Sequence, residues 1–163
     1  MTNNFNTLKT MDLFEKLDER ERGQLSALPI YIALLIAGAD GTVDNSEIKQ
    51  AISFSRLTTS TADHAINAFY NDVYQDFEDK LKVVAANMPQ CKVEREKLLI
   101  DQIRDVNVIL KKIEKPRAFA LYESFRRLAK KIAIASGGIF GLGNISKEES
   151  ELLELNMLEN PSV

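Results

Sequence analysis

The sequence has few of the residues on which catalysis and covalent cross-linking depend. Among its 163 residues there is one cysteine, Cys91, and one histidine, His64. A single cysteine cannot form a disulfide within the chain, which favours a reducing, cytoplasmic setting. A nucleophile–base arrangement would have to use these two residues, and their sequence neighbours give it no support. We therefore predict no catalytic residue, a surface or capping position for His64, and a passive, partly buried thiol for Cys91.

The chain also lacks a basic charge excess and a long apolar run. Its net charge is −3, so no overall positive field attracts nucleic acid. The longest apolar run, 30–37, is far shorter than a membrane span. Residues 1–9 are polar and lack the apolar segment of a signal peptide. We expect a cytoplasmic protein with no membrane insertion and no nucleic-acid partner.

No segment shows the sustained alternation of apolar and polar residues that is typical of strands. Hydrophobic residues make up 45% and charged residues 28%, as in ordinary globular proteins. The length suits one domain with its own core. We predict a disordered tail over 1–6 and a single helical domain over 7–160. The predicted fold is an all-α, compact bundle of about seven helices joined by short connections.

Apolar spacing of three and four residues predicts where these helices lie. The expected helices cover 7–22, 26–39, a segment after Asp44, a segment ending at Met88, 92–114, a segment from Pro116 to Gly137, and 147–158. Gly23 is the predicted stop between the first two. The helix over 26–39 is apolar nearly all round and is expected at the centre of the core. The helix that ends at Met88 carries one continuous stripe: Tyr70, Tyr74, Phe77, Leu81, Val84 and Met88.

A glycine turn after the central helix carries the main chemical pattern. Residues 40–47 read Asp-Gly-Thr-Val-Asp-Asn-Ser-Glu, which matches the second half of an EF-hand calcium loop. Glycine permits a positive φ, and the three carboxylates can converge on a hard cation. Ile36 and Gly38 stand where a full EF-hand has its first two aspartates. A complete EF-hand is therefore excluded.

Helix capping is the alternative explanation for part of this turn. Asp44 and Glu47 have the spacing of a capping box, as do Ser146 and Glu149 near the other end of the chain. Asp40 is not explained in this way. It follows the C-terminus of a predicted helix, where a negative charge is unfavourable, and this placement indicates a nearby cation.

The second glycine turn is a weaker copy of the first. When Gly143 is aligned on Gly41, Glu149 corresponds to Glu47, while Ser146 and Leu142 replace the two aspartates. Glu148 adds one carboxylate beside it. If the two turns pack side by side, five carboxylates form a shared site for a divalent metal ion (calcium, magnesium or zinc): Asp40, Asp44, Glu47, Glu148 and Glu149.

These two turns and the all-helical length make residues 10–158 similar to the tellurite-resistance TerB family. The helical domain at the N-terminus of some membrane-bound DnaJ-like co-chaperones shares the pattern. The resemblance implies a compact bundle, a non-enzymatic role in bacterial stress and tellurite resistance, and a metal ion held by acidic residues of both turns. The family's acidic positions fall on Asp40, Asp44, Glu47 and Glu149. Leu142 and Ser146 depart from the pattern.

Two other functions stay open on the residues alone. The first is a purely structural or protein-interaction module in which the turns are only caps. The second is an enzyme in which Asp40 and Glu47 act on a metal-bound water. A protein partner or a homodimer is also expected. We interpret the basic residues of the sixth predicted helix as a solvated face that can also serve a partner: Arg126, Arg127, Lys130 and Lys131.

Overall fold

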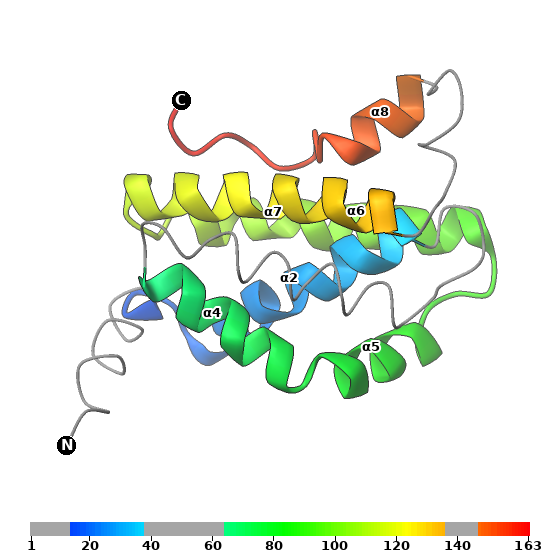
Figure 1. Cartoon of the computed structure of the whole chain (residues 1–163), viewed down its shortest axis with the longest axis horizontal. Helices are drawn as coiled ribbons and strands as arrows, with labels where there is room; N and C mark the ends of the chain where they lie inside the picture. The colour runs from blue at the N-terminus through cyan, green and yellow to red at the C-terminus, as the bar shows by residue number, and fades with distance from the viewer. Residues whose placement is uncertain (1–13, 38–63, 136–146) are drawn as a thin grey trace.

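The computed structural model describes residues 14–37, 64–135 and 147–163 (Figure 1). Within these ranges the chain is all-helical, with six helices and no strand. The helices are α2 Glu19–Ala37, α4 His64–Gln75, α5 Phe77–Ala86, α6 Lys92–Leu110, α7 Lys115–Ala135 and α8 Lys147–Leu153. The all-α prediction is confirmed for this part of the chain. None of the described helices combines the length and the apolar character that a membrane crossing needs. The predicted 1–6 tail lies outside the described residues.

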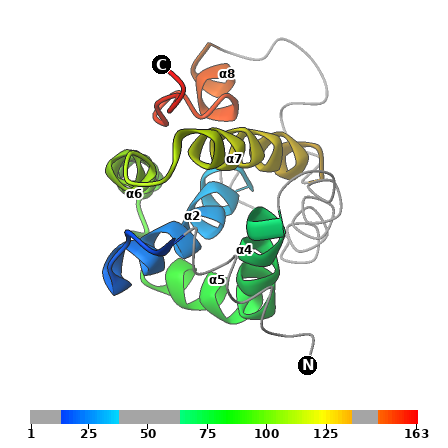
Figure 2. The same cartoon turned by 90° about the vertical axis from the view of Figure 1, so that its left-hand side faces the viewer.

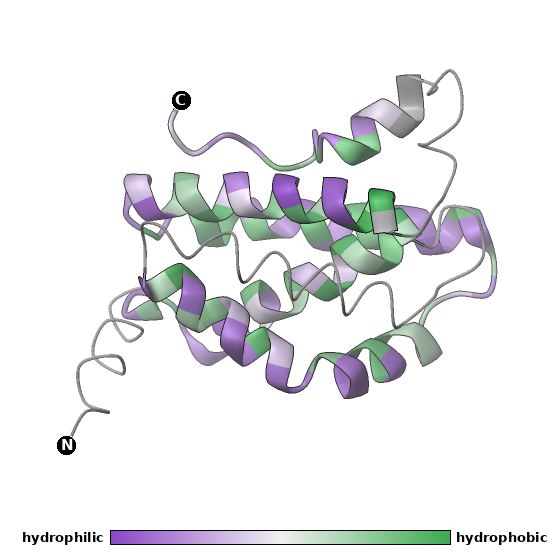
Figure 3. Cartoon of the chain, viewed as in Figure 1, coloured by the Kyte–Doolittle hydropathy of each residue, from purple (hydrophilic) through white to green (hydrophobic). Residues whose placement is uncertain are grey.

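Helix α2 lies at the centre of the bundle. It packs against α6 and α7 on one side and against α4 and α5 on the other, as the end-on view shows (Figure 2). Its second half is buried without a gap from Leu28 to Ala37, apart from the half-buried Tyr31. Hydrophilic residues lie on the outward sides of the surrounding helices (Figure 3). The predicted central position of this apolar segment is therefore confirmed.

The predicted helix break at Gly23 is wrong, because α2 runs through it. The helix begins with a reciprocal capping box: Glu21 N–H donates to Asp18 Oδ1 at 2.8 Å, and Asp18 N–H donates to Glu21 Oε2 at 3.1 Å. An interior glycine costs only about 1 kcal/mol. Burial of leucines beyond it, such as the fully buried Leu25, outweighs this cost.

The predicted single helix ending at Met88 is instead two helices, α4 and α5, which meet at Asp76. Residues of the predicted stripe still face the core on both sides of the break, since Tyr70, Phe77 and Leu81 are all buried. The backbone of Asp76 departs from helical geometry, with φ −109° and ψ 10°. Both short helices pack against α2 on either side of this break.

Helices α6 and α7 run in opposite directions (Figure 1), and the apolar stripes that their spacing predicts are buried. Pro116 lies in the first turn of α7, where its missing N–H removes no hydrogen bond. Phe125 of α7 packs edge-on against Phe69 of α4, with ring centroids 6.0 Å apart. Beside them, the Tyr70 and Ser124 hydroxyls are hydrogen-bonded at 2.8 Å. The helix predicted over 92–114 ends earlier, at Leu110.

Candidate functional site

Most of the predicted metal site lies outside the described residues. This applies to Asp40, Asp44 and Glu47. Glu148 and Glu149 lie in the first turn of α8, and only their backbone is described. Within the described residues, no group of three or more histidine, cysteine, aspartate or glutamate side chains is placed to hold a metal ion. The meeting of the two acidic turns stays a prediction.

The helices that border the two turns are described, and they are neighbours. Helix α2 ends at Ala37, three residues before Asp40, and α8 begins at Lys147, next to Glu148. Helix α8 packs on α7 and touches α2. The end of α2 and the start of α8 lie toward the same end of the molecule, on the right of Figure 1.

The two residues considered for nucleophilic chemistry lie at helix starts on the surface. His64 is exposed at the first position of α4, in agreement with the predicted surface position. Cys91 immediately precedes α6 and is fully exposed, so the prediction of a partly buried thiol is wrong. The chain reverses direction at the surface between Pro89 and α6, which leaves this side chain in solvent. The backbone N–H groups of Glu94 and Val93 lower the pKa of the thiol, because they stabilise the thiolate.

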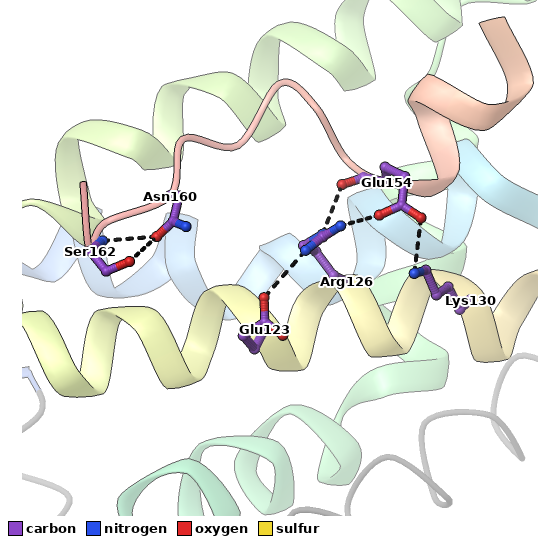
Figure 4. Close-up of polar contacts among 6 residues, drawn as sticks. All are labelled: Glu123, Arg126, Lys130, Glu154, Asn160 and Ser162. Carbon is purple, nitrogen blue, oxygen red and sulfur yellow. Dashed lines mark hydrogen bonds and ion pairs between the residues drawn. The ribbon is translucent and has the colours of Figure 1, made fainter. Parts of the chain in front are cut away.

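Part of the basic face of α7 binds the chain's own C-terminal region (Figure 4). Arg126 and Lys130 both contact the carboxylate of Glu154, the Lys130 Nζ at 2.9 Å. Arg126 Nε also donates to the Glu154 carbonyl oxygen at 3.2 Å, and its guanidinium lies 5.5 Å from the centroid of the Tyr122 ring. The hydrogen bonds from Lys130 and Arg126 lower the pKa of the Glu154 carboxyl. These two cations are therefore not part of a freely solvated face.

The last predicted helix ends at Leu153 instead of Leu158, and the ten residues after it form the C-terminal segment (154–163). The end has the pattern of a Schellman motif. Leu155 N–H donates to the Leu152 carbonyl at 3.1 Å, and Asn156 N–H donates to the Glu151 carbonyl at 3.2 Å. Leu155 has φ 50°, a conformation that normally favours glycine. Its side chain is nevertheless fully buried.

Asn107 of α6 holds the C-terminal segment by its backbone. Its Nδ2 donates to the Met157 carbonyl at 2.9 Å, and its Oδ1 accepts the Glu159 N–H at 2.9 Å. The asparagine is only 6% exposed. Sequence reasoning missed this residue. The available signal was a polar side chain beside Val106 on the buried stripe of α6.

Two cavities lie beside this contact, and Asn107 and Glu159 line both. The first, of about 280 Å³, lies toward the start of α7 and the chain end, next to Lys115, Ala118 and Val163. The second, of about 520 Å³, lies between α6 and α8. Its walls combine the apolar Ile100, Leu152 and Met157 with charged groups, which are Glu96, Arg104, Glu151 and Glu159. Neither lining contains His64 or Cys91.

Comparison with known proteins gives a sequence relative without an assigned activity. No protein-family profile matches the chain, and no solved structure matches it. The chain is similar to the uncharacterized protein ORF11' of Methanothermobacter thermautotrophicus, with 28% identity over 118 residues. The similar region covers 71% of this chain and 74% of that protein. The name of that protein assigns no activity.

Proposed function

We propose that this protein is a non-enzymatic helical module of TerB type, which binds a divalent cation through its two acidic turns. The ligands are carboxylates of both turns: Asp40, Asp44, Glu47, Glu148 and Glu149. The association with bacterial stress and tellurite resistance rests on the sequence resemblance. The observation that supports cation binding is structural: α2 and α8, the helices that border the two turns, touch each other.

The electrostatics of helix ends supports the same proposal. The C-terminus of α2 carries negative partial charge, and Asp40 follows it by three residues. A carboxylate there is unfavourable by itself, and a bound cation offsets both charges. Oxygen ligands from carboxylates are those that calcium and magnesium prefer. The replacement of acidic residues by Leu142 and Ser146 reduces the number of ligands, so we expect weaker binding than a complete set of carboxylates would give.

Calorimetric titration with calcium, magnesium or zinc tests this proposal. The full chain should bind one of these ions, and Asp40→Asn should remove the binding while leaving the thermal unfolding temperature of the metal-free protein nearly unchanged. Asp79→Asn is the matched control, because Asp79 is an exposed carboxylate on α5. It should bind the ion as the unmodified chain does. No binding at millimolar ion would assign both turns to capping and leave a structural or protein-interaction module.

A further inference from the structure

The C-terminal segment lies against α6 and α7 and is turned over residues 154–158, with Leu158 N–H donating to the Leu155 carbonyl at 2.8 Å. The Asn107 side chain bonds the carbonyl of Met157 and the N–H of Glu159, two residues further along. Both groups belong to the backbone, so this contact does not depend on the side chains at those positions. A single buried amide thus fixes the course and the register of the segment.

Charges and apolar side chains on either side of this contact define a pattern. Glu154 contacts Arg126 and Lys130, and the Glu159 carboxylate lies 2.7 Å from Lys111 Nζ. Between the two glutamates, Leu155 and Leu158 are buried, at 0% and 3% exposure. Met157, between these leucines, is partly buried against the core. The groove that holds the segment therefore matches the order acidic, apolar, any, apolar, apolar, acidic.

The chain's own segment fits this groove imperfectly. Leu155 reaches its buried position only with a left-handed backbone, which crowds an L side chain. Cavities of about 280 and 520 Å³ stay open beside the Asn107 contact. The ion pair of Lys111 with Glu159 is more than half exposed on both sides, and such pairs stabilise little. The segment is therefore an occupant that a better-fitting one can replace.

We propose that this groove is a docking site for an acidic segment of a partner protein, and that the C-terminal segment is its intramolecular occupant. The partner segment carries apolar residues flanked by acidic ones, in the order given above. Lys111, Arg126 and Lys130 provide the complementary positive charge. The partner displaces the C-terminal segment. This inference does not depend on a cation at the acidic turns.

The test uses a fluorescein-labelled peptide of residues 151–163 as the probe and the full chain as the receptor. Glu154→Lys weakens the internal occupant by placing a third positive charge beside Arg126 and Lys130. We expect the peptide to bind this variant about tenfold more tightly than the unmodified chain, since the internal segment competes at high effective concentration. Adding Asn107→Ala should reverse the gain. Asp79→Lys, a charge reversal at an exposed position of α5, should bind like the unmodified chain.

Specificity and folding are measured in the same series. A peptide with serine in place of Leu155 and Leu158 should not bind Glu154→Lys. Equal binding of both peptides, or no gain in Glu154→Lys with unchanged helical circular dichroism, would overturn the proposal. A dimer in light scattering would assign the groove to a second copy and overturn the partner assignment.

A second measurement applies if Glu154→Lys loses helical signal. The unmodified chain is then titrated with the unlabelled native peptide and followed by NMR. The amide resonances of the C-terminal segment (154–163) should move toward unstructured values as the peptide saturates the groove. Unchanged resonances at saturating peptide would contradict displacement.

Discussion

The left-handed backbone at Leu155 makes an unusual prediction about glycine. At most positions Ala is more stabilising than Gly, because glycine loses more backbone entropy on folding. At φ 50° the order should reverse, since only glycine adopts this conformation without a clash of Cβ. We therefore predict that Leu155→Gly is less destabilising than Leu155→Ala.

The magnitudes follow from burial and backbone strain. Leu155 is fully buried, and truncation of a buried leucine to alanine costs about 3 kcal/mol or more. Glycine also loses the contacts of Cβ, but it relieves about 1–2 kcal/mol of left-handed strain. The greater conformational freedom of glycine in the unfolded chain lowers the stability of the glycine variant by about 0.4–1 kcal/mol, which offsets part of this relief. The free energy of unfolding of the glycine variant should therefore exceed that of the alanine variant by up to about 1 kcal/mol.

Leu158 is the matched control for this prediction. It is also buried, at 3% exposure, and among the described residues Leu155 is the one non-glycine residue with positive φ. At Leu158 alanine should be the better replacement, by about 0.4–1 kcal/mol. Urea unfolding followed by circular dichroism measures all four variants. If alanine is also better at position 155, the Schellman end of α8 is refuted.

Three further predictions concern other parts of the chain. Gly23→Ala should raise the free energy of unfolding, measured by urea denaturation, by about 0.5–1 kcal/mol. The reason is that this exposed position is helical and an added Cβ would meet no neighbouring atom within 4 Å. A loss of stability would contradict the continuous α2. Ser124→Ala should cost about 1–3 kcal/mol, because it leaves the buried Tyr70 hydroxyl without its partner, and much of this cost should vanish in the Tyr70→Phe background. Additive losses in the double-mutant cycle would show that the two hydroxyls do not interact. The pKa of the Cys91 thiol is lowered, and the reactive thiolate is lost only as the pH falls below that pKa. The rate of Cys91 alkylation by iodoacetamide should therefore reach half its maximum at a lower pH than the alkylation rate of a cysteine in an unstructured peptide. A midpoint at or above the midpoint of the unstructured peptide would contradict this.

Sequence patterns predicted the parts of the fold in which local periodicity and burial agree. The stripes of α6 and α7, such as Leu99 and Ile103 or Leu121 and Phe125, are buried as their spacing indicates. The apolar run of α2 correctly predicted its central position. In these elements each residue's burial follows from its helical face.

The failures occur where tertiary packing overrides local signals. Gly23 looked like a stop, but the burial of α2 carries the helix through it. The stripe across Asp76 is continuous in sequence, and its division appears only because α4 and α5 both pack on α2. The end of α8 was misplaced since Leu155 stands where glycine is usual.

For similar reasons, the sequence indicates the two acidic turns but not the groove that holds the C-terminal segment. Glycine and carboxylate spacing indicates the two acidic turns, and their role stays a prediction. The groove was missed because it depends on long-range partners. Asn107 meets residues some fifty positions later in the chain. Arg126 and Lys130 looked like solvated charges, since the sequence alone does not show that Glu154 lies above them.

We propose above that both acidic turns contribute to one cation site. The most direct measurement is an amide NMR titration of the full chain with calcium, repeated with magnesium and zinc. We expect resonances around 40–47 and 143–149 to shift together, with one shared midpoint, and Asp40→Asn to remove both sets of shifts. Shifts in a single turn, different midpoints for the two turns, or no shifts at millimolar ion would contradict it.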